Sequence, residues 1–102
     1  MLAHNVFFTL AEKSKANREK LIAGCKKYLA DHPGAVFFGC GELAEELRRD
    51  VNDREFDVAL HIVFADPASQ DRYQVAPRHQ EFIAECKHLW SRVRVFDSVV
   101  ER

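Results

Sequence analysis

Two histidines and one tyrosine occupy positions from which they could transfer protons. His4 alternates with Val6 and Phe8 along a segment with strand periodicity, so all three side chains should face one apolar layer. His79 opens an apolar stripe at helical spacing, and Tyr73 shortly precedes it. An imidazole can accept a proton from an acidic carbon or hydroxyl at neutral pH. A tyrosine hydroxyl can stabilise the oxyanion that results.

The same three side chains also have a purely structural explanation. Histidines on apolar faces are often buried core residues, and they mark functional sites only statistically. The spacing therefore leaves both interpretations open. The sequence contains no HExxH pattern, and Cys25, Cys40 and Cys86 lack a CxxC spacing. We therefore predict neither a metal site nor a cofactor.

Four strands and three helices are expected to position these residues. The strands are predicted over 2–10, 35–40, 56–64 and 93–96, and the helices over 14–31, 67–75 and 77–90. Pro33-Gly34 predicts the end of the first helix, and Asp66-Pro67 the start of the second. This βαββαβ order favours an α+β ferredoxin-like sandwich with all helices on one sheet face. The whole chain, 1–102, is expected to form a single domain.

The sheet face opposite the helices is predicted to be apolar as well. It should carry Phe7, Phe37, Ala59 and Val63. Monomers rarely leave such a patch in water, and stacking two sheets face to face would bury it. We therefore predict a homodimer through the sheet faces, with His61 at the interface. Of the other histidines, His32 is predicted to be exposed in a turn, and His88 to lie on the polar side of the last helix.

The charge balance argues against several classes of partner. The chain has 15 basic and 16 acidic residues, so we predict no binding to nucleic acid or to acidic membrane surfaces. No stretch approaches the roughly 20 apolar residues of a membrane span. The N-terminal residues show no secretory signal, and the odd number of cysteines favours a reducing compartment. A cytoplasmic location is expected.

Several motifs resemble the stress-responsive alpha/beta barrel (Dabb) domain family. Residues 4–10 resemble its opening H-x-V-x-F-x-L strand, and residues 64–66 its F-x-S. Residues 73–82 are similar to its Y-x-x-H-P-x-H-x-x-F motif, with Ala76 in place of the first histidine. Residues 95–97 match its final strand. The resemblance covers essentially the whole chain and implies a ferredoxin-like protomer that pairs into a dimeric alpha-beta barrel.

The resemblance also implies roles for individual residues. In olivetolic acid cyclase-type members, the last-helix histidine acts as base, the tyrosine assists and the first-strand histidine supports them. Carried over, these roles fall on His79, Tyr73 and His4. The residues expected to line the ligand pocket are Ile22, Cys25, Leu60, Ile62 and Trp90.

Two functions follow from these expectations. The first is a stress-response protein that binds a small, mostly apolar aromatic or acyl ligand in a cavity between sheet and helices. The alternative is a cofactor-independent enzyme, polyketide cyclase-like or isomerase- or monooxygenase-like, with His79 as general base. A cavity on which His4, Tyr73 and His79 converge would favour the enzyme.

Overall fold

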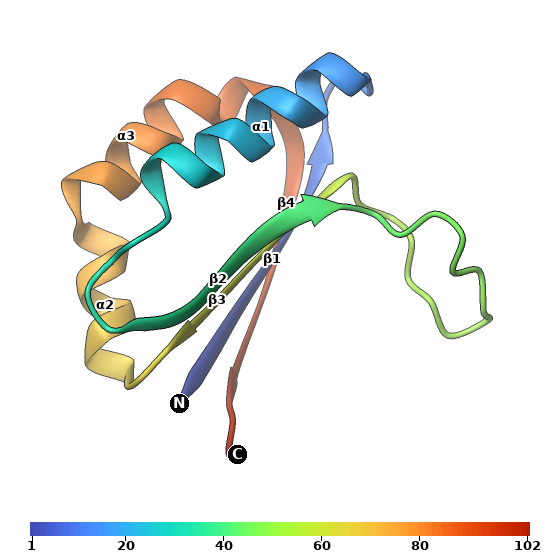
Figure 1. Ribbon diagram of the computed structural model, residues 1–102. Coiled ribbons are helices and arrows are strands. Elements are labelled where there is room, and N and C mark those ends of the chain that lie inside the picture. The colour runs from blue at the N-terminus through green and yellow to red at the C-terminus, as the bar shows by residue number, and fades with distance from the viewer.

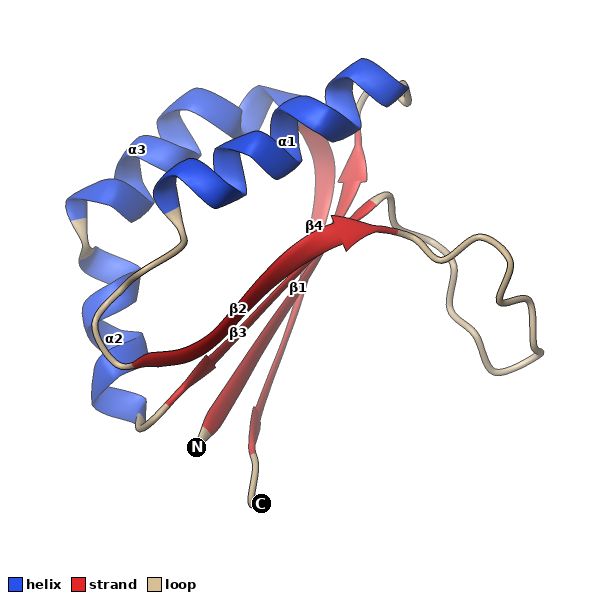
Figure 2. Cartoon of the chain, viewed as in Figure 1, coloured by secondary structure: helices blue, strands red, loops and turns tan.

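The chain forms a four-stranded sheet with all helices on one face, as Figures 1 and 2 show. The computed structural model describes all residues, 1–102. Its elements are β1 (Leu2–Leu10), α1 (Lys15–Tyr28), β2 (Ala35–Glu42), β3 (Val58–Phe64), α2 (Pro67–Val75), α3 (Pro77–Cys86), a 3-10 turn (Lys87–Leu89) and β4 (Trp90–Val99). The strand order is β2-β3-β1-β4, and every neighbouring pair is antiparallel. The predicted ferredoxin-like α+β fold is confirmed.

Helix α1 is shorter than the sequence suggests. Its start is capped by Ser14, whose hydroxyl accepts a 3.1 Å hydrogen bond from a first-turn backbone amide. The helix ends at Tyr28 rather than at Asp31. Asp31 and Gly34 both adopt positive φ, 61° and 84°, so the intervening residues form a tight turn back to the sheet. The turn therefore replaces the last helical residues that periodicity predicts.

The C-terminal region differs more from the sequence prediction. The predicted helix over 77–90 ends at Cys86, and Trp90 begins strand β4 instead of closing the helical stripe. The Trp90 ring packs 5.0 Å from Phe8 and 5.7 Å from Phe82 between ring centroids. Strand β4 extends to Val99 because it pairs along almost the whole of β1. Cross-strand pairing has therefore overridden the local helical spacing.

The core lies between the sheet and the helices. Its most deeply buried large side chains, each no more than 1% exposed, are Leu21, Leu29, Leu60, Ile62 and Phe64. Leu21 lies in α1, Leu29 follows its last residue, and the other three lie in β3, so these buried side chains gather beneath α1. No helix is long and apolar enough to cross a membrane.

The opposite sheet face is open and aromatic. Phe37 and Phe96 are 56% and 54% exposed, and Phe7 contacts Phe96 edge-on at 5.7 Å. His61 lies on the same face, where its Nδ1 is 2.7 Å from Oδ1 of Asn5. Residues 43–57 form a loop that projects beyond the sheet and away from the helices (Figure 1). A single chain leaves these aromatic side chains uncovered.

Candidate functional site

A cavity of about 380 Å³ lies between the helix pair α2 and α3 and the half of the sheet formed by β1 and β4. Its polar lining residues are His4, Tyr73, Gln74, His79 and Asp97. Its apolar lining residues are Val6, Phe8, Leu60, Ile83, Trp90, Val93 and Val95. The volume falls within the range of small-molecule sites. All three residues predicted to transfer protons therefore reach one cavity.

Strand β4 keeps this cavity open to solvent. Val93 and Val95 are the cross-strand partners of Phe8 and Val6, so they point to the helix-covered face. They are nevertheless 37% and 49% exposed. This exposure shows that the helices leave the edge strand uncovered, and a ligand can enter there.

The break between α2 and α3 brings Tyr73 and His79 together. Asp66 caps α2 by accepting a 2.8 Å hydrogen bond from a backbone amide. Ala76 is extended, with ψ 142°, because the following Pro77 disfavours a helical conformation there. Pro77 then begins α3 in a new direction. As a result the Tyr73 and His79 ring centroids lie 4.8 Å apart, edge to face.

His4 is held by a carboxylate that the sequence prediction did not single out. His4 and Asp97 are directly paired across β1 and β4, and Nδ1 of the imidazole is 2.6 Å from the carboxylate Oδ1. The His4 ring is buried, whereas the Asp97 side chain is 44% exposed. The carboxylate accepts a hydrogen bond from Nδ1–H, which leaves Nε2 of a neutral ring as the acceptor. Only the strand register reveals this pair.

His79 and Tyr73 present unpaired polar atoms. Nδ1 of His79 is buried and has no hydrogen-bond partner within the chain. Burial lowers the pKa of His79, and the nearby His4 and His32 lower it further, so the ring is neutral at pH 7. Burial raises the pKa of Tyr73, which keeps its hydroxyl protonated. The cavity thus holds a neutral base beside a hydrogen-bond donor.

His32 is not exposed, contrary to the sequence prediction. It is only 6% exposed, and its Nε2 lies 2.7 Å from the backbone carbonyl oxygen of Tyr28. Its ring contacts Tyr73 edge-on, with centroids 4.9 Å apart. The tight turn after α1 places it there, outside the cavity wall. His32 therefore supports Tyr73 from the packed interior.

The residues predicted to line a ligand pocket fall into two groups. Leu60 and Trp90 line the cavity. Ile22, Cys25 and Ile62 belong to the packed layer under α1 and do not line it. Five further lining residues were not predicted as part of a pocket: Gln74, Ile83, Val93, Val95 and Asp97.

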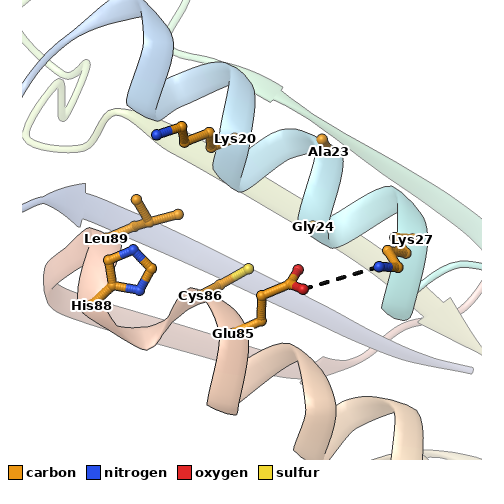
Figure 3. Close-up of a pocket in the computed structure, with 8 residues that line it drawn as sticks. All are labelled: Lys20, Ala23, Gly24, Lys27, Glu85, Cys86, His88 and Leu89. Atoms are coloured by element: carbon orange, nitrogen blue, oxygen red, sulfur yellow. Dashed lines mark ion pairs between the residues drawn. The ribbon is translucent and has the colours of Figure 1, made fainter.

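A second hollow lies on the outer helical surface, in the groove between α1 and α3 shown in Figure 3. Its volume is about 420 Å³, and its polar lining side chains are Lys20, Lys27, Glu85 and His88. Lys27 and Glu85 form a loose ion pair at 4.0 Å, and both side chains are more than half exposed. These charges are solvated, whereas His79 presents a buried, unpaired nitrogen. The cavity beside β4 is therefore the better candidate site.

The sequence matches a family model, the Stress responsive A/B Barrel Domain, over residues 2–100. The chain belongs to the Dabb family. The match confirms the resemblance seen in the strand motif at 4–10 and the segment 73–82. No curated protein gives a significant match to this Dabb chain.

Solved structures share the Dabb chain's fold. A Dabb family protein with a ferredoxin-like fold from Mesorhizobium loti is 23% identical, with a TM-score of 0.77, over 99% of this chain and 97% of that one. A dimeric ferredoxin-like protein of unknown function from Thermobifida fusca is 15% identical, with a TM-score of 0.77, over 97% and 90%. A hydroxynitrile lyase from Passiflora edulis is 20% identical, with a TM-score of 0.75, over 98% and 93%. At these identities the likeness concerns the fold.

Proposed function

We propose that this Dabb protein binds a small, mostly apolar ligand in the cavity between its sheet and helices. The observation that carries the proposal is the cavity itself, of about 380 Å³, whose wall includes His4, Tyr73 and His79. Polar side chains on one part of the wall and apolar side chains on the rest suit a ligand with one hydroxyl or carbonyl group and an apolar body. The hydroxyl of Tyr73, which makes no hydrogen bond within the chain, lines the same cavity.

A second candidate function is proton-transfer catalysis without a cofactor, of the polyketide cyclase-like, isomerase-like or monooxygenase-like kind. Its support is the convergence of His4, Tyr73 and His79 on one cavity, together with the lowered pKa of His79. A base must be unprotonated at the working pH, and the low pKa keeps the imidazole in that form. The fold is also that of a hydroxynitrile lyase, which shows that this architecture can carry catalysis.

In this candidate reaction the protein moves one proton. Neutral His79 accepts it from an acidic C–H or O–H of the substrate, and the bonding electrons shift onto a substrate oxygen. The protonated Tyr73 hydroxyl donates a hydrogen bond to the oxyanion that forms. His4, oriented by Asp97, can accept a hydrogen bond from a substrate hydroxyl at Nε2. A substrate body that fills the cavity would displace water from these groups and so strengthen the interactions.

Binding can be tested with 4-propylphenol as the probe, by calorimetry and by the fluorescence of the chain's single tryptophan, Trp90, which lines the cavity. We expect saturable binding, and we expect His79→Ala and Tyr73→Phe to weaken it by about tenfold, the equivalent of one lost hydrogen bond. His88→Ala, which removes an exposed histidine, is the matched control. Equal binding by the native chain and the His79 variant would contradict the proposal.

The proposal includes a homodimer paired through the open sheet face. Phe37 and Phe96 are more than half exposed there, and a protein of the same fold is described as dimeric. Burying this face against a second copy would remove the apolar patch from water. Sedimentation should show a dimer, and Phe96→Glu should shift it toward monomer. A native chain that sediments as a monomer at micromolar concentration would refute this assembly.

We also propose that the protein is located in the cytoplasm, as predicted from the sequence.

A further inference from the structure

We infer that the polar end of the ligand is a neutral hydroxyl or carbonyl group and not a carboxylate or phosphate. This inference rests on the proposed function, because it concerns the chemistry of the same cavity. It is based on the charged side chains of the cavity wall, which include one carboxylate but no lysine or arginine.

The cavity contains no positive side chain that could neutralise an anion. No lysine or arginine lines it, and Asp97 is its only carboxylate. His4 is hydrogen-bonded to Asp97, so the pair carries a net charge of minus one with a neutral ring and zero with a protonated ring. Neither state offers net attraction to an anionic group. A carboxylate entering here would lose its hydration and face Asp97.

Three arginines on the elements that surround the cavity make other contacts. Arg94 pairs with Phe7 across the strands and therefore lies on the opposite sheet face, where it binds Asp53 at 2.9 Å. Arg78 donates a 2.9 Å hydrogen bond to a backbone carbonyl of α1. Arg72 donates a 3.1 Å hydrogen bond to a serine hydroxyl in α2. None of these three guanidinium groups lines the cavity.

The groups that remain suit a neutral partner. Tyr73 stays protonated and donates, while the neutral His79 ring, which also lines the cavity, carries one acceptor and one donor nitrogen. A hydroxyl can accept from the first and donate to the second. Away from this polar end the wall consists of side chains such as Phe8, Ile83 and Trp90. The ligand is therefore a neutral head on an aromatic or aliphatic body.

A matched pair of probes tests the charge directly. At pH 7.5, 4-propylphenol is neutral and 4-propylbenzoate is an anion, while the two share the same apolar body. Calorimetry and quenching of Trp90 fluorescence should show at least about tenfold tighter binding of the phenol, the ratio that one uncompensated buried charge readily produces. Equal or tighter binding of the benzoate would overturn the inference and leave the proposed function standing. Binding of neither probe would overturn both.

A variant without the Asp97 charge tests whether this carboxylate causes the preference for the phenol over the benzoate. Asp97→Asn should raise benzoate affinity several-fold relative to phenol affinity, because it removes the one negative charge at the cavity. Glu46→Gln removes a charge from the exposed loop between β2 and β3 and should leave the ratio unchanged. Circular dichroism checks that both variants are folded. An unchanged ratio in Asp97→Asn would refute the role of this carboxylate.

Discussion

The helix-covered face of the sheet has two halves that differ in packing. Under α1, over β2 and β3, the layer is packed with side chains: Leu21 and Cys25 are 0% exposed and Leu29 is 1% exposed. Beside α3, over β1 and β4, the same layer contains a cavity of about 380 Å³. Figure 2 shows the helices gathered on one face of the strands. One face of one sheet thus provides a packed core in one half and a candidate site in the other.

The close approach of α1 and α3 helps to explain this difference. A Cβ atom on Gly24 would lie 2.5 Å from Sγ of Cys86, so the glycine allows the two helices to meet there. Figure 3 shows the Cys86 side chain directed toward α1. With the helices drawn together over the inner strands, the edge strand β4 receives little cover. Close packing of the two helices in one half therefore leaves space for a cavity in the other half.

The largest effect is expected from the packed half. Leu21→Ala removes a fully buried side chain and should lower the free energy of unfolding by about 3 kcal/mol. Probe binding by the folded fraction should be unchanged, because Leu21 does not line the cavity. Urea unfolding measures the first quantity and calorimetry with 4-propylphenol the second. If Leu21→Ala weakened probe binding without lowering the free energy of unfolding, the packed half would take part in binding, contrary to this prediction.

The reverse pattern is expected from the hollow half. Ile83→Trp should fill part of the cavity and weaken probe binding by about tenfold, or about 1.4 kcal/mol. The free energy of unfolding should change little, because the added ring occupies existing space. Val75→Trp, at a position that is 75% exposed, is the size-matched control. A large loss of stability in Ile83→Trp would show that the cavity half is packed as tightly as the other.

The contact between the helices should show a smaller, specific effect. Gly24→Ala introduces a clash with Cys86 and should destabilise the fold by about 1 kcal/mol, even though alanine favours a helix. Adding Cys86→Ala should recover part of this loss because it removes the clashing sulfur. A double-mutant cycle by urea unfolding measures the coupling. Strictly additive effects would show that the two positions do not meet.

The smallest effect is expected in the pH dependence of stability. The pKa of His79 is lowered in the folded chain, so as pH falls below about 6.5 the unfolded chain binds this proton first. The contribution of His79 to the free energy of unfolding should therefore be fully present above that pH. It should decrease as the pH falls from there toward the lowered pKa of the folded chain. His79→Gln should flatten this part of the profile between pH 7.5 and 5, while His88→Gln should not. If the native chain and His79→Gln showed the same dependence of stability on pH, a group other than His79 would cause it.

Much of the fold could be predicted because the relevant signals are local. Strand alternation placed β1, and Asp66-Pro67 marked the start of α2. The helical spacing through Trp90 was misleading, because strand pairing with β1 outweighed it. His32 was misplaced for a similar reason: a turn composition that usually indicates exposure is packed here against Tyr73.

The sequence by itself determined the order of elements, which periodicity encodes, and it contains the motifs that resemble the Dabb family. It also predicted that His4 and His79 face the same layer between sheet and helices. Only the tertiary structure decided which half of the layer stays hollow and which carboxylate holds His4. Both depend on contacts between residues far apart in the chain: Gly24 with Cys86 between helices, and His4 with Asp97 between strands. Such contacts are set by packing and strand register, which no local pattern specifies.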